Sequence, residues 1–149
     1  MARVALAAKG GRKVHMAKIR ILLADDHTLF RQGIKTLISA EPDMEVVGEA
    51  SNGGDAVEKA AEVRPDVVLM DIGMPGMDGY ELMRAIRALP DEHAQRVPAV
   101  AVTAYARSED RQRALAEGFQ LHLAKPIEPA AFASAVARLS RSAELAAIS

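Results

Sequence analysis

The sequence predicts an α/β fold in which a five-stranded parallel sheet is doubly wound, with helices on both faces. Five short aliphatic runs alternate along the chain with five segments whose apolar residues recur at helical spacing. The aliphatic runs are too continuous to leave one strand face in water, which is typical of a parallel sheet covered on both sides. Such alternation favours right-handed crossovers between the strands.

The first two strands and the first helix occupy the beginning of this pattern. An aliphatic run at residues 19–24 predicts the first strand, which ends at an acidic pair. Apolar residues at helical spacing over 29–38 predict the first helix, and we expect Asp26 or Thr28 to cap it. The second strand is expected at 45–50, where acidic residues at both ends suit the edge of a sheet.

The middle of the chain repeats the alternation. Residues 51–55 are expected to form a turn, and the small apolar residues within 56–63 predict a helix that ends before a proline. Four apolar residues at 67–70 predict a strand that is buried on both faces. An amphipathic helix is expected over 80–86, followed by a polar connection at 89–96.

Two further strand and helix pairs complete the sheet. Residues 98–102 predict the fourth strand, and the helix after it is expected to be capped by Ser108 and stopped by a left-handed Gly118. Residues 121–124 predict the fifth strand, and Pro129 starts the last helix.

Length and composition fit one globular domain. The chain has 149 residues, 50% of them hydrophobic and 26% charged. No apolar run approaches the roughly 18 residues needed to cross a bilayer. Cysteine is absent, which excludes disulfides and thiolate chemistry and fits a reducing compartment, so we expect a cytoplasmic protein.

The charges are distributed unevenly along the chain. Residues 1–20 contain six basic side chains and no acidic one, whereas the rest carries 13 basic against 20 acidic side chains. We expect 1–17 to be a flexible basic extension, 18–140 to form the domain and 141–149 to be a C-terminal tail. A weak contact of the extension with nucleic acid or an anionic surface stays open.

Four of the five predicted strands end in a side chain that can do chemistry. Asp25 and Asp26 follow the first strand, Asp71 the third, Thr103 the fourth and Lys125 the fifth. Because the carboxyl ends of parallel strands share one edge of a sheet, we expect these groups to meet. Clustered carboxylates need a cation, and a set of oxygen ligands favours Mg²⁺. Lysine and threonine opposite that ion would hold a phosphoryl group, which makes Asp71 the candidate nucleophile.

Each of these residues also has a simpler interpretation. Asp25, Asp26 or Asp71 could cap a turn or helix, Thr103 could be a satisfied strand-end hydroxyl, and Lys125 could be a solvated surface charge. Their joint position at successive strand ends favours the functional interpretation.

Several motifs, in order and spacing, resemble the receiver domain of two-component response regulators over about residues 18–140. They are Asp25-Asp26, Met70-Asp71-Ile72-Gly73-Met74-Pro75 with Asp78-Gly79, Val102-Thr103-Ala104 and Lys125-Pro126. The resemblance implies a CheY-like, flavodoxin-like (βα)5 domain with strand order 2-1-3-4-5.

The resemblance also implies a role for each residue of the site. Asp71 would accept a phosphoryl group from the phosphohistidine of a sensor histidine kinase or phosphotransfer protein. Asp26, Asp71 and the backbone carbonyl of Gly73 would hold Mg²⁺, with Asp25 acting through water. Lys125 would pair with Asp71 beside a cis bond to the following proline.

Receiver domains switch when they are phosphorylated, and the resemblance implies which residues take part. Thr103 would move to the phosphoryl group, and the side chain at His122 would follow. The family more often has Tyr or Phe there, so we expect an altered switch and some dependence on pH. Gly73 and Tyr105 occupy positions thought to tune the loss of phosphate.

The main alternative is a Mg²⁺-dependent phosphohydrolase that forms an aspartyl phosphate on the same fold. Phosphatases of the haloacid dehalogenase class carry a general acid two residues after the nucleophile, where this chain has Gly73. We therefore expect a signalling phosphoacceptor rather than an enzyme, with at most slow loss of its own phosphate.

The expected partners follow from the same resemblance. The domain would act on a downstream effector protein, and a homodimer through the fourth helix, fifth strand and fifth helix is possible. No membrane contact is expected. The ten residues after Leu139 are too few for a helix-turn-helix, so direct DNA binding is not expected either. The output is then expected to come from a partner, or the sequence is a piece of a longer protein.

Overall fold

A computed structural model describes residues 18–104 and 107–148 of the chain. One five-stranded parallel sheet runs through it in the order β2-β1-β3-β4-β5, as expected. The strands are β1 (Ile19–Ala24), β2 (Met44–Ala50), β3 (Val67–Asp71), β4 (Ala99–Thr103) and β5 (Leu121–Ala124). The helices are α1 (Thr28–Ser39), α2 (Gly53–Val63), α3 (Gly79–Arg87), α4 (Glu92–Arg96), α5 (Ser108–Ala116) and α6 (Pro129–Ile148). The predicted doubly wound α/β fold is confirmed.

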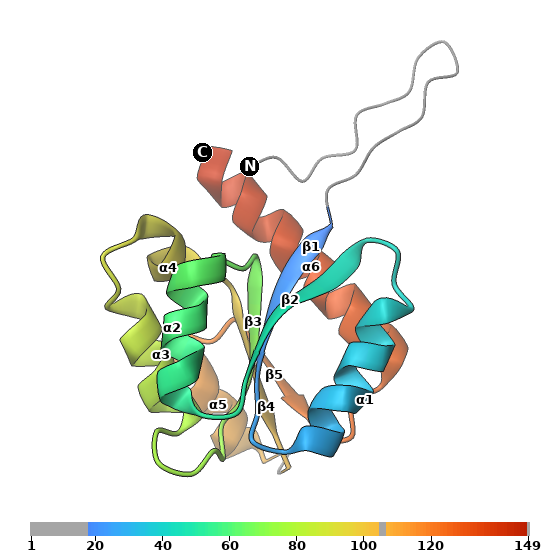
Figure 1. The fold of residues 1–149 in the computed structure, drawn as a ribbon, viewed down its shortest axis with the longest axis horizontal. Helices are drawn as coiled ribbons and strands as arrows, with labels where there is room; N and C mark the ends of the chain where they lie inside the picture. The colour runs from blue at the N-terminus through green and yellow to red at the C-terminus, as the bar shows by residue number, and fades with distance from the viewer. Residues whose placement is uncertain (1–17, 105–106, 149) are drawn as a thin grey trace.

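Two hydrophobic cores lie on opposite faces of the sheet (Figure 1). One core packs α2, α3 and α5 against the sheet, and the other packs α1 and α6 against it. Neighbouring residues of one strand serve different cores, since Leu22 belongs to the first and Leu23 to the second. This double burial explains the continuous aliphatic runs of β1, β3 and β4, because almost every residue of these strands is buried whichever face it lies on.

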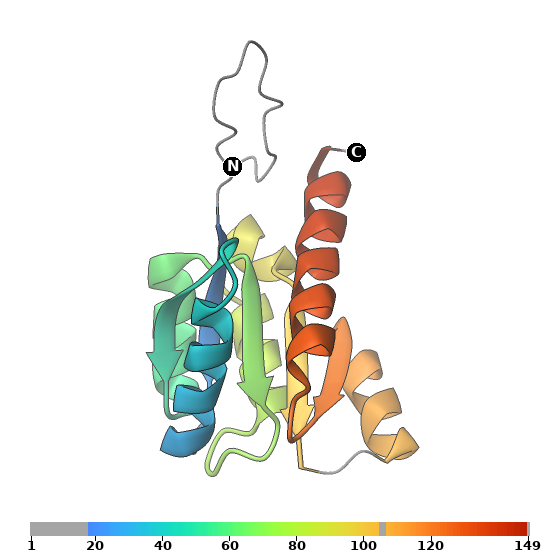
Figure 2. The same ribbon diagram turned by 90° about the vertical axis from the view of Figure 1, so that its right-hand side faces the viewer.

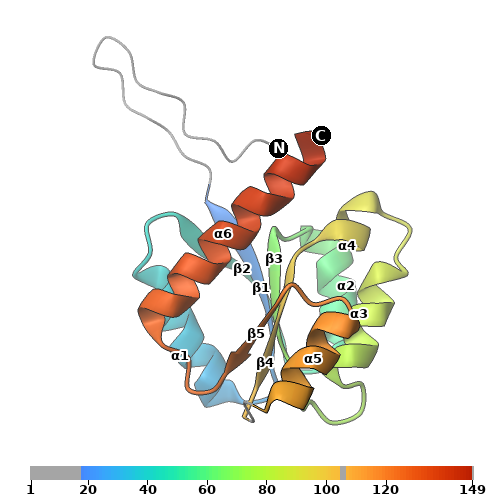
Figure 3. The same ribbon diagram turned by 180° about the vertical axis from the view of Figure 1, so that it is seen from behind.

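The strands all point toward the same edge of the sheet, where the loops that follow them gather (Figure 2). In the view from behind, α6 crosses one face from end to end, with α1 beside it (Figure 3). The sheet thus forms a rigid floor, and the strand-to-helix loops at one edge carry the candidate functional residues.

The connection predicted to be polar and irregular contains a short helix, α4. Asp91 starts it, because its side chain accepts a hydrogen bond from the backbone of His93. Only Ala94 of this five-residue helix is buried, so the segment has no hydrophobic periodicity that could reveal it. As a result, the predicted fourth and fifth helices are α5 and α6.

Several predicted helix boundaries are wrong. α2 begins at Gly53, inside the expected turn, because the side chain of Asn52 caps it by accepting the amide of Asp55. α1 and α5 have His27 and Arg107 as their N-cap residues, so neither Asp26, Thr28 nor Ser108 takes the predicted capping position. The prediction for the end of α5 is correct, since Gly118 has a φ of +104°.

The last helix is longer than expected. α6 continues to Ile148, through most of the segment 141–149 that the sequence suggested as a tail. Inside the domain, α6 buries Phe132 and Val136 against the sheet. The expectation for residues 1–17 lies outside the described residues.

Candidate functional site

Strand pairing brings the acidic residues together. β1 lies beside β3, and Ala24 is aligned with Met70, so Asp25 and Asp71 follow at the same level. Both side chains are buried, with Asp25 3% and Asp71 5% exposed. Two carboxylates that lie 46 positions apart in the sequence therefore share one desolvated pocket, where the charge of Asp25 raises the cost of ionising Asp71.

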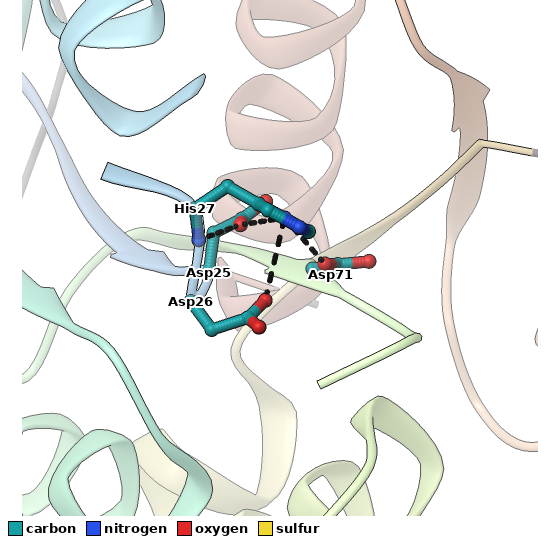
Figure 4. A group of neighbouring side chains, drawn as sticks. All are labelled: Asp25, Asp26, His27 and Asp71. Atoms are coloured by element: carbon teal, nitrogen blue, oxygen red, sulfur yellow. Dashed lines mark hydrogen bonds and ion pairs between the residues drawn. The ribbon is translucent and has the colours of Figure 1, made fainter. Parts of the chain in front are cut away.

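Asp26 and His27 complete a cluster at this edge (Figure 4). Asp25, Asp26, His27 and Asp71 each offer one ligand atom, and these atoms all lie within 4.8 Å of one another. Asp26 is partly buried, and its Oδ1 is inaccessible, with no hydrogen-bond partner among the described residues. A buried carboxylate oxygen without a donor is costly, and a bound cation would satisfy it.

Lys125 places its ammonium group beside the two buried carboxylates. Its Nζ lies 3.0 Å from Oδ2 of Asp25 and 3.5 Å from Oδ2 of Asp71. The same Nζ lies 4.1 Å from the centre of the Phe30 ring, a cation–π distance. The predicted convergence of strand ends is therefore observed for the first, third and fifth strands.

The carboxylate of Asp71 is oriented by its own loop. Oδ1 accepts a hydrogen bond of 3.0 Å from the backbone amide of Gly73, while Oδ2 faces Lys125. Burial raises the pKa of the Asp71 carboxyl, and the charges of Asp25 and Asp26 raise it further. The amide of Gly73 and the charge of Lys125 act in the opposite direction but are outweighed.

Asp25 is engaged at both of its oxygens. Oδ1 accepts a hydrogen bond of 2.7 Å from the amide of His27, and Oδ2 accepts one from Lys125. These contacts hold the start of α1 against the last strand. Asp26, whose Oδ1 has no hydrogen-bond partner among the described residues, is then the carboxylate best placed to take up an ion, and it belongs to the expected set for Mg²⁺.

The loop after Asp71 packs tightly on the start of α3. A Cβ atom at Gly79 would lie 2.7 Å from Cα of Ile72 and 3.0 Å from the carbonyl oxygen of Asp71. Asp78 and Glu81 form a capping box that fixes the first turn of α3. The glycine thus allows the helix to approach the backbone that carries Asp71.

Thr103 and His122 lie on the two strands nearest the lysine. Thr103 ends β4 opposite Ala124, next to Lys125, while His122 lies inside β5 opposite Ala101. The Nε2 atom of His122 is buried, with no hydrogen-bond partner in the described part of the chain. Burial lowers the pKa of His122. Tyr105, the other residue named from the resemblance, lies outside the described residues.

His27 is a site residue that sequence reasoning missed. In the sequence it is only part of the stretch that leads into the first helix, yet its Nδ1 lies 3.1 Å from Oδ1 of Asp25. A signal was present, since Asp25-Asp26-His27 places three potential metal ligands in succession after a strand.

A doubly wound α/β domain with acidic residues, a phosphoacceptor candidate and a lysine at one sheet edge defines a class of phosphate-handling signalling domain. The family model for the response regulator receiver domain matches residues 21–137. The chain belongs to this family.

Curated relatives agree with the family assignment. The nitrate/nitrite response regulator protein NarL of Escherichia coli strain K12 is 42% identical over 109 residues, which cover 73% of this chain and 49% of NarL. The transcriptional regulatory protein LiaR of Bacillus subtilis is 51% identical over 74 residues, covering 49% of this chain and 35% of LiaR. A protein-glutamate methylesterase/protein-glutamine glutaminase of Nocardioides is 55% identical over 73 residues, which cover 49% of this chain and 20% of that protein. The chain spans about half or less of each of these relatives.

Solved structures show the same fold. The signal receiver domain of NarL from Mycobacterium tuberculosis matches with a TM-score of 0.75 and 32% identity, over 84% of this chain and 98% of that one. The receiver domain of the sensor histidine kinase PA1611 from Pseudomonas aeruginosa matches with a TM-score of 0.73 and 34% identity, over 83% and 98%. That structure has a magnesium ion coordinated in the active site cleft.

One expectation does not agree with the relatives. LiaR is a transcriptional regulatory protein, and a DNA-binding response regulator of the LuxR family from Staphylococcus aureus matches with a TM-score of 0.72 and 26% identity, over 82% of this chain and 98% of that one. The expectation that the protein does not bind DNA directly therefore does not fit these relatives. Among the described helices, none combines the length and apolar character needed to span a membrane.

Proposed function

We propose that Asp71 accepts a phosphoryl group from the phosphohistidine of a sensor histidine kinase or phosphotransfer protein. The observation that carries this proposal is the orientation of Asp71, whose Oδ1 is held by Gly73 while Oδ2 faces Lys125 at 3.5 Å. An Asp71 oxygen attacks phosphorus, the bond between phosphorus and the histidine nitrogen breaks, and the imidazole leaves with the electron pair.

Asp26, Asp71 and the backbone carbonyl of Gly73 would hold Mg²⁺ in this reaction, and Asp25 would assist. The buried Oδ1 of Asp26 supports this set, because it has no hydrogen-bond partner among the described residues, its ion-pair contact with Nδ1 of His27 is 3.4 Å long, and a bound ion would supply a direct contact. When bound, Mg²⁺ offsets the negative charge of the transferring phosphoryl group. Lys125 offsets charge from the opposite side and then binds the phosphoryl oxygens.

Thr103 and His122 would transmit phosphorylation to the surface of α5, β5 and α6. Thr103 stands next to Lys125 in register, so its hydroxyl can hydrogen-bond a phosphoryl oxygen on Asp71. His122 would follow as a partly buried side chain whose Nε2 atom is inaccessible. If His122→Phe and the wild type showed identical phosphorylation-dependent NMR shifts in α6, His122 would have no part in the switch.

The domain would hold its phosphate rather than turn over phosphate esters. A hydrolase of this chemistry needs a proton donor for the leaving group, and Gly73 offers no side chain at the position two residues after Asp71. Family relatives that regulate transcription support a DNA-binding effector as the output. We propose that phosphorylation controls such an effector through the surface of α5, β5 and α6, in part by pairing two copies of the domain.

Intact mass spectrometry after incubation with acetyl phosphate and Mg²⁺ tests the core of this proposal. The wild type should gain one phosphoryl group, Asp71→Asn should gain none, and the control Asp55→Asn, on α2, should be labelled like the wild type. Labelling of Asp71→Asn would refute the assignment. Sustained release of phosphate from simple phosphate esters would favour the hydrolase instead.

A further inference from the structure

His27 extends its ring into the carboxylate cluster from the start of α1 (Figure 4). Its backbone amide is fixed by Asp25, while its side chain is 64% exposed. Nδ1 lies 3.1 Å from Oδ1 of Asp25, 3.4 Å from Oδ1 of Asp26 and 3.7 Å from Oδ2 of Asp71. One nitrogen atom therefore faces an oxygen of all three carboxylates.

These separations match those of atoms that share one small cation. Two ligand atoms, each about 2.1 Å from an ion, lie roughly 3.0 Å apart at a right angle and roughly 3.4 Å apart at a tetrahedral angle. The contacts of Nδ1 with Asp26 and Asp71, at 3.4 and 3.7 Å, are longer than a normal hydrogen bond but close to this spacing. The geometry thus suits a nitrogen ligand beside two oxygen ligands.

We propose that His27 Nδ1 is a metal ligand, and that it gives this receiver site a preference for first-row transition-metal dications such as Co²⁺, Ni²⁺ or Zn²⁺. Imidazole nitrogen suits these ions, whereas Mg²⁺ takes oxygen ligands and keeps much of its water. Asp26 and Asp71 supply oxygen ligands to either kind of ion, and His27 adds a bond only to the transition metal. This inference rests on the metal site of the proposed function.

The role of Asp25 in this arrangement is to position His27. Both Asp25 oxygens already accept hydrogen bonds, Oδ1 from the amide of His27 and Oδ2 from Lys125, and Oδ1 is also the hydrogen-bond partner of His27 Nδ1 at 3.1 Å, a bond that a metal on Nδ1 would replace. The first of these bonds fixes the backbone from which the imidazole projects. Residues that hydrogen-bond to a metal-coordinating histidine and orient it commonly raise the affinity of the site for its metal.

Metal titrations of the full chain at one fixed pH test the inference. Mg²⁺ binding is followed by calorimetry and Co²⁺ binding by the visible d–d absorption of the ion, for wild type, His27→Ala and the control His93→Gln on α4, far from the site. His27→Ala should weaken Co²⁺ binding about tenfold or more and change its absorption spectrum, while Mg²⁺ affinity stays within about twofold. The control should match the wild type for both ions.

Three results would overturn the inference. Equal Co²⁺ affinity and spectra in wild type and His27→Ala would show that the imidazole is not a ligand. Tighter binding of both ions to His27→Ala would show that the ring competes with the metal. The variant Asp71→Asn distinguishes a failure of this inference from a failure of the proposed function. Unchanged Mg²⁺ affinity in Asp71→Asn would refute the metal site itself. If Asp71→Asn weakens Mg²⁺ binding but His27→Ala leaves Co²⁺ binding unchanged, only the role of His27 is refuted and the phosphoacceptor proposal stands.

Discussion

Lys125 donates a hydrogen bond to Asp25 across the site, with 3.0 Å between Nζ and Oδ2, although 100 positions separate them in the chain. The lysine side chain is 18% exposed and the aspartate side chain 5%. The same ammonium group lies 3.5 Å from Asp71, so one cation offsets two buried carboxylates. Removing one partner of such a contact leaves buried charge without compensation.

Lys125→Met should therefore lower the free energy of unfolding in metal-free buffer by about 2 to 4 kcal/mol. Adding Asp25→Asn to that variant should restore part of the loss, because one of the uncompensated charges is gone. Urea unfolding with a chelator measures both. Lys35→Met is the control. The side chain of Lys35 is 42% exposed and pairs with Glu49, so this substitution should lower the free energy of unfolding by less than about 1 kcal/mol. A loss no larger than in this control would contradict the prediction.

Asp71→Asn should raise the free energy of unfolding of the metal-free protein near neutral pH. Burial raises the pKa of Asp71 above its ordinary 3.8, so the folded protein favours the neutral carboxyl. As pH rises from about 3.8, the unfolded chain ionises first and the wild type loses stability until the folded-state pKa is passed. The advantage of asparagine should thus shrink as pH falls toward 3.8. Urea unfolding at several pH values measures the difference in free energy of unfolding between Asp71→Asn and the wild type, with Asp55→Asn as the control. A difference that does not change with pH would contradict the prediction.

His122 should make stability depend on pH in the opposite direction. Burial lowers its pKa below the ordinary 6.5; Arg111 acts in the same direction and Asp110 against it. The unfolded chain therefore takes up a proton first as pH falls below 6.5, and stability is lost down to the folded-state pKa. Between about pH 7.5 and about pH 5.5, wild type should lose up to about 1 kcal/mol more than His122→Phe. Parallel pH profiles for the two proteins would show that His122 does not contribute.

Gly79→Ala should destabilise the domain by about 1 to 3 kcal/mol and slow the labelling of Asp71, because the added methyl group meets the Ile72 backbone at 2.7 Å. Gly33→Ala is the matched control. It lies inside α1, where an added methyl group would meet no atom within 4 Å, so it should stabilise by about 0.5 to 1 kcal/mol. Thermal unfolding and acetyl phosphate labelling measure both variants. Equal effects of the two substitutions would contradict the close-approach argument.

The sheet and the positions of its charged strand ends could be predicted because each aliphatic run stops abruptly at a polar residue. That boundary is local, and parallel pairing then places Asp25 and Asp71 together without further information. Burial on both faces also left a clear signal, since polar residues are absent from β3 until Asp71.

The direction of individual side chains could not be predicted in the same way. α1 has His27 as its N-cap residue and no side-chain cap, and the carboxylate of Asp26 lies in the acidic cluster instead. His27 enters the cluster only because α1 starts at that angle, which depends on packing against the sheet. α4 was missed for a related reason: a single buried alanine leaves no periodic pattern.

The order in which the site residues occur along the chain has a consequence for biosynthesis. A ribosome delivers Asp25 and Asp71 well before Lys125, so a nascent domain carries the crowded negative charge before it carries the ammonium that offsets it. Since Lys125 follows the final strand, the electrostatically complete pocket can form only when nearly the whole domain has left the exit tunnel. The proposed transfer of a phosphoryl group to Asp71 would thus have to await nearly complete translation of the domain.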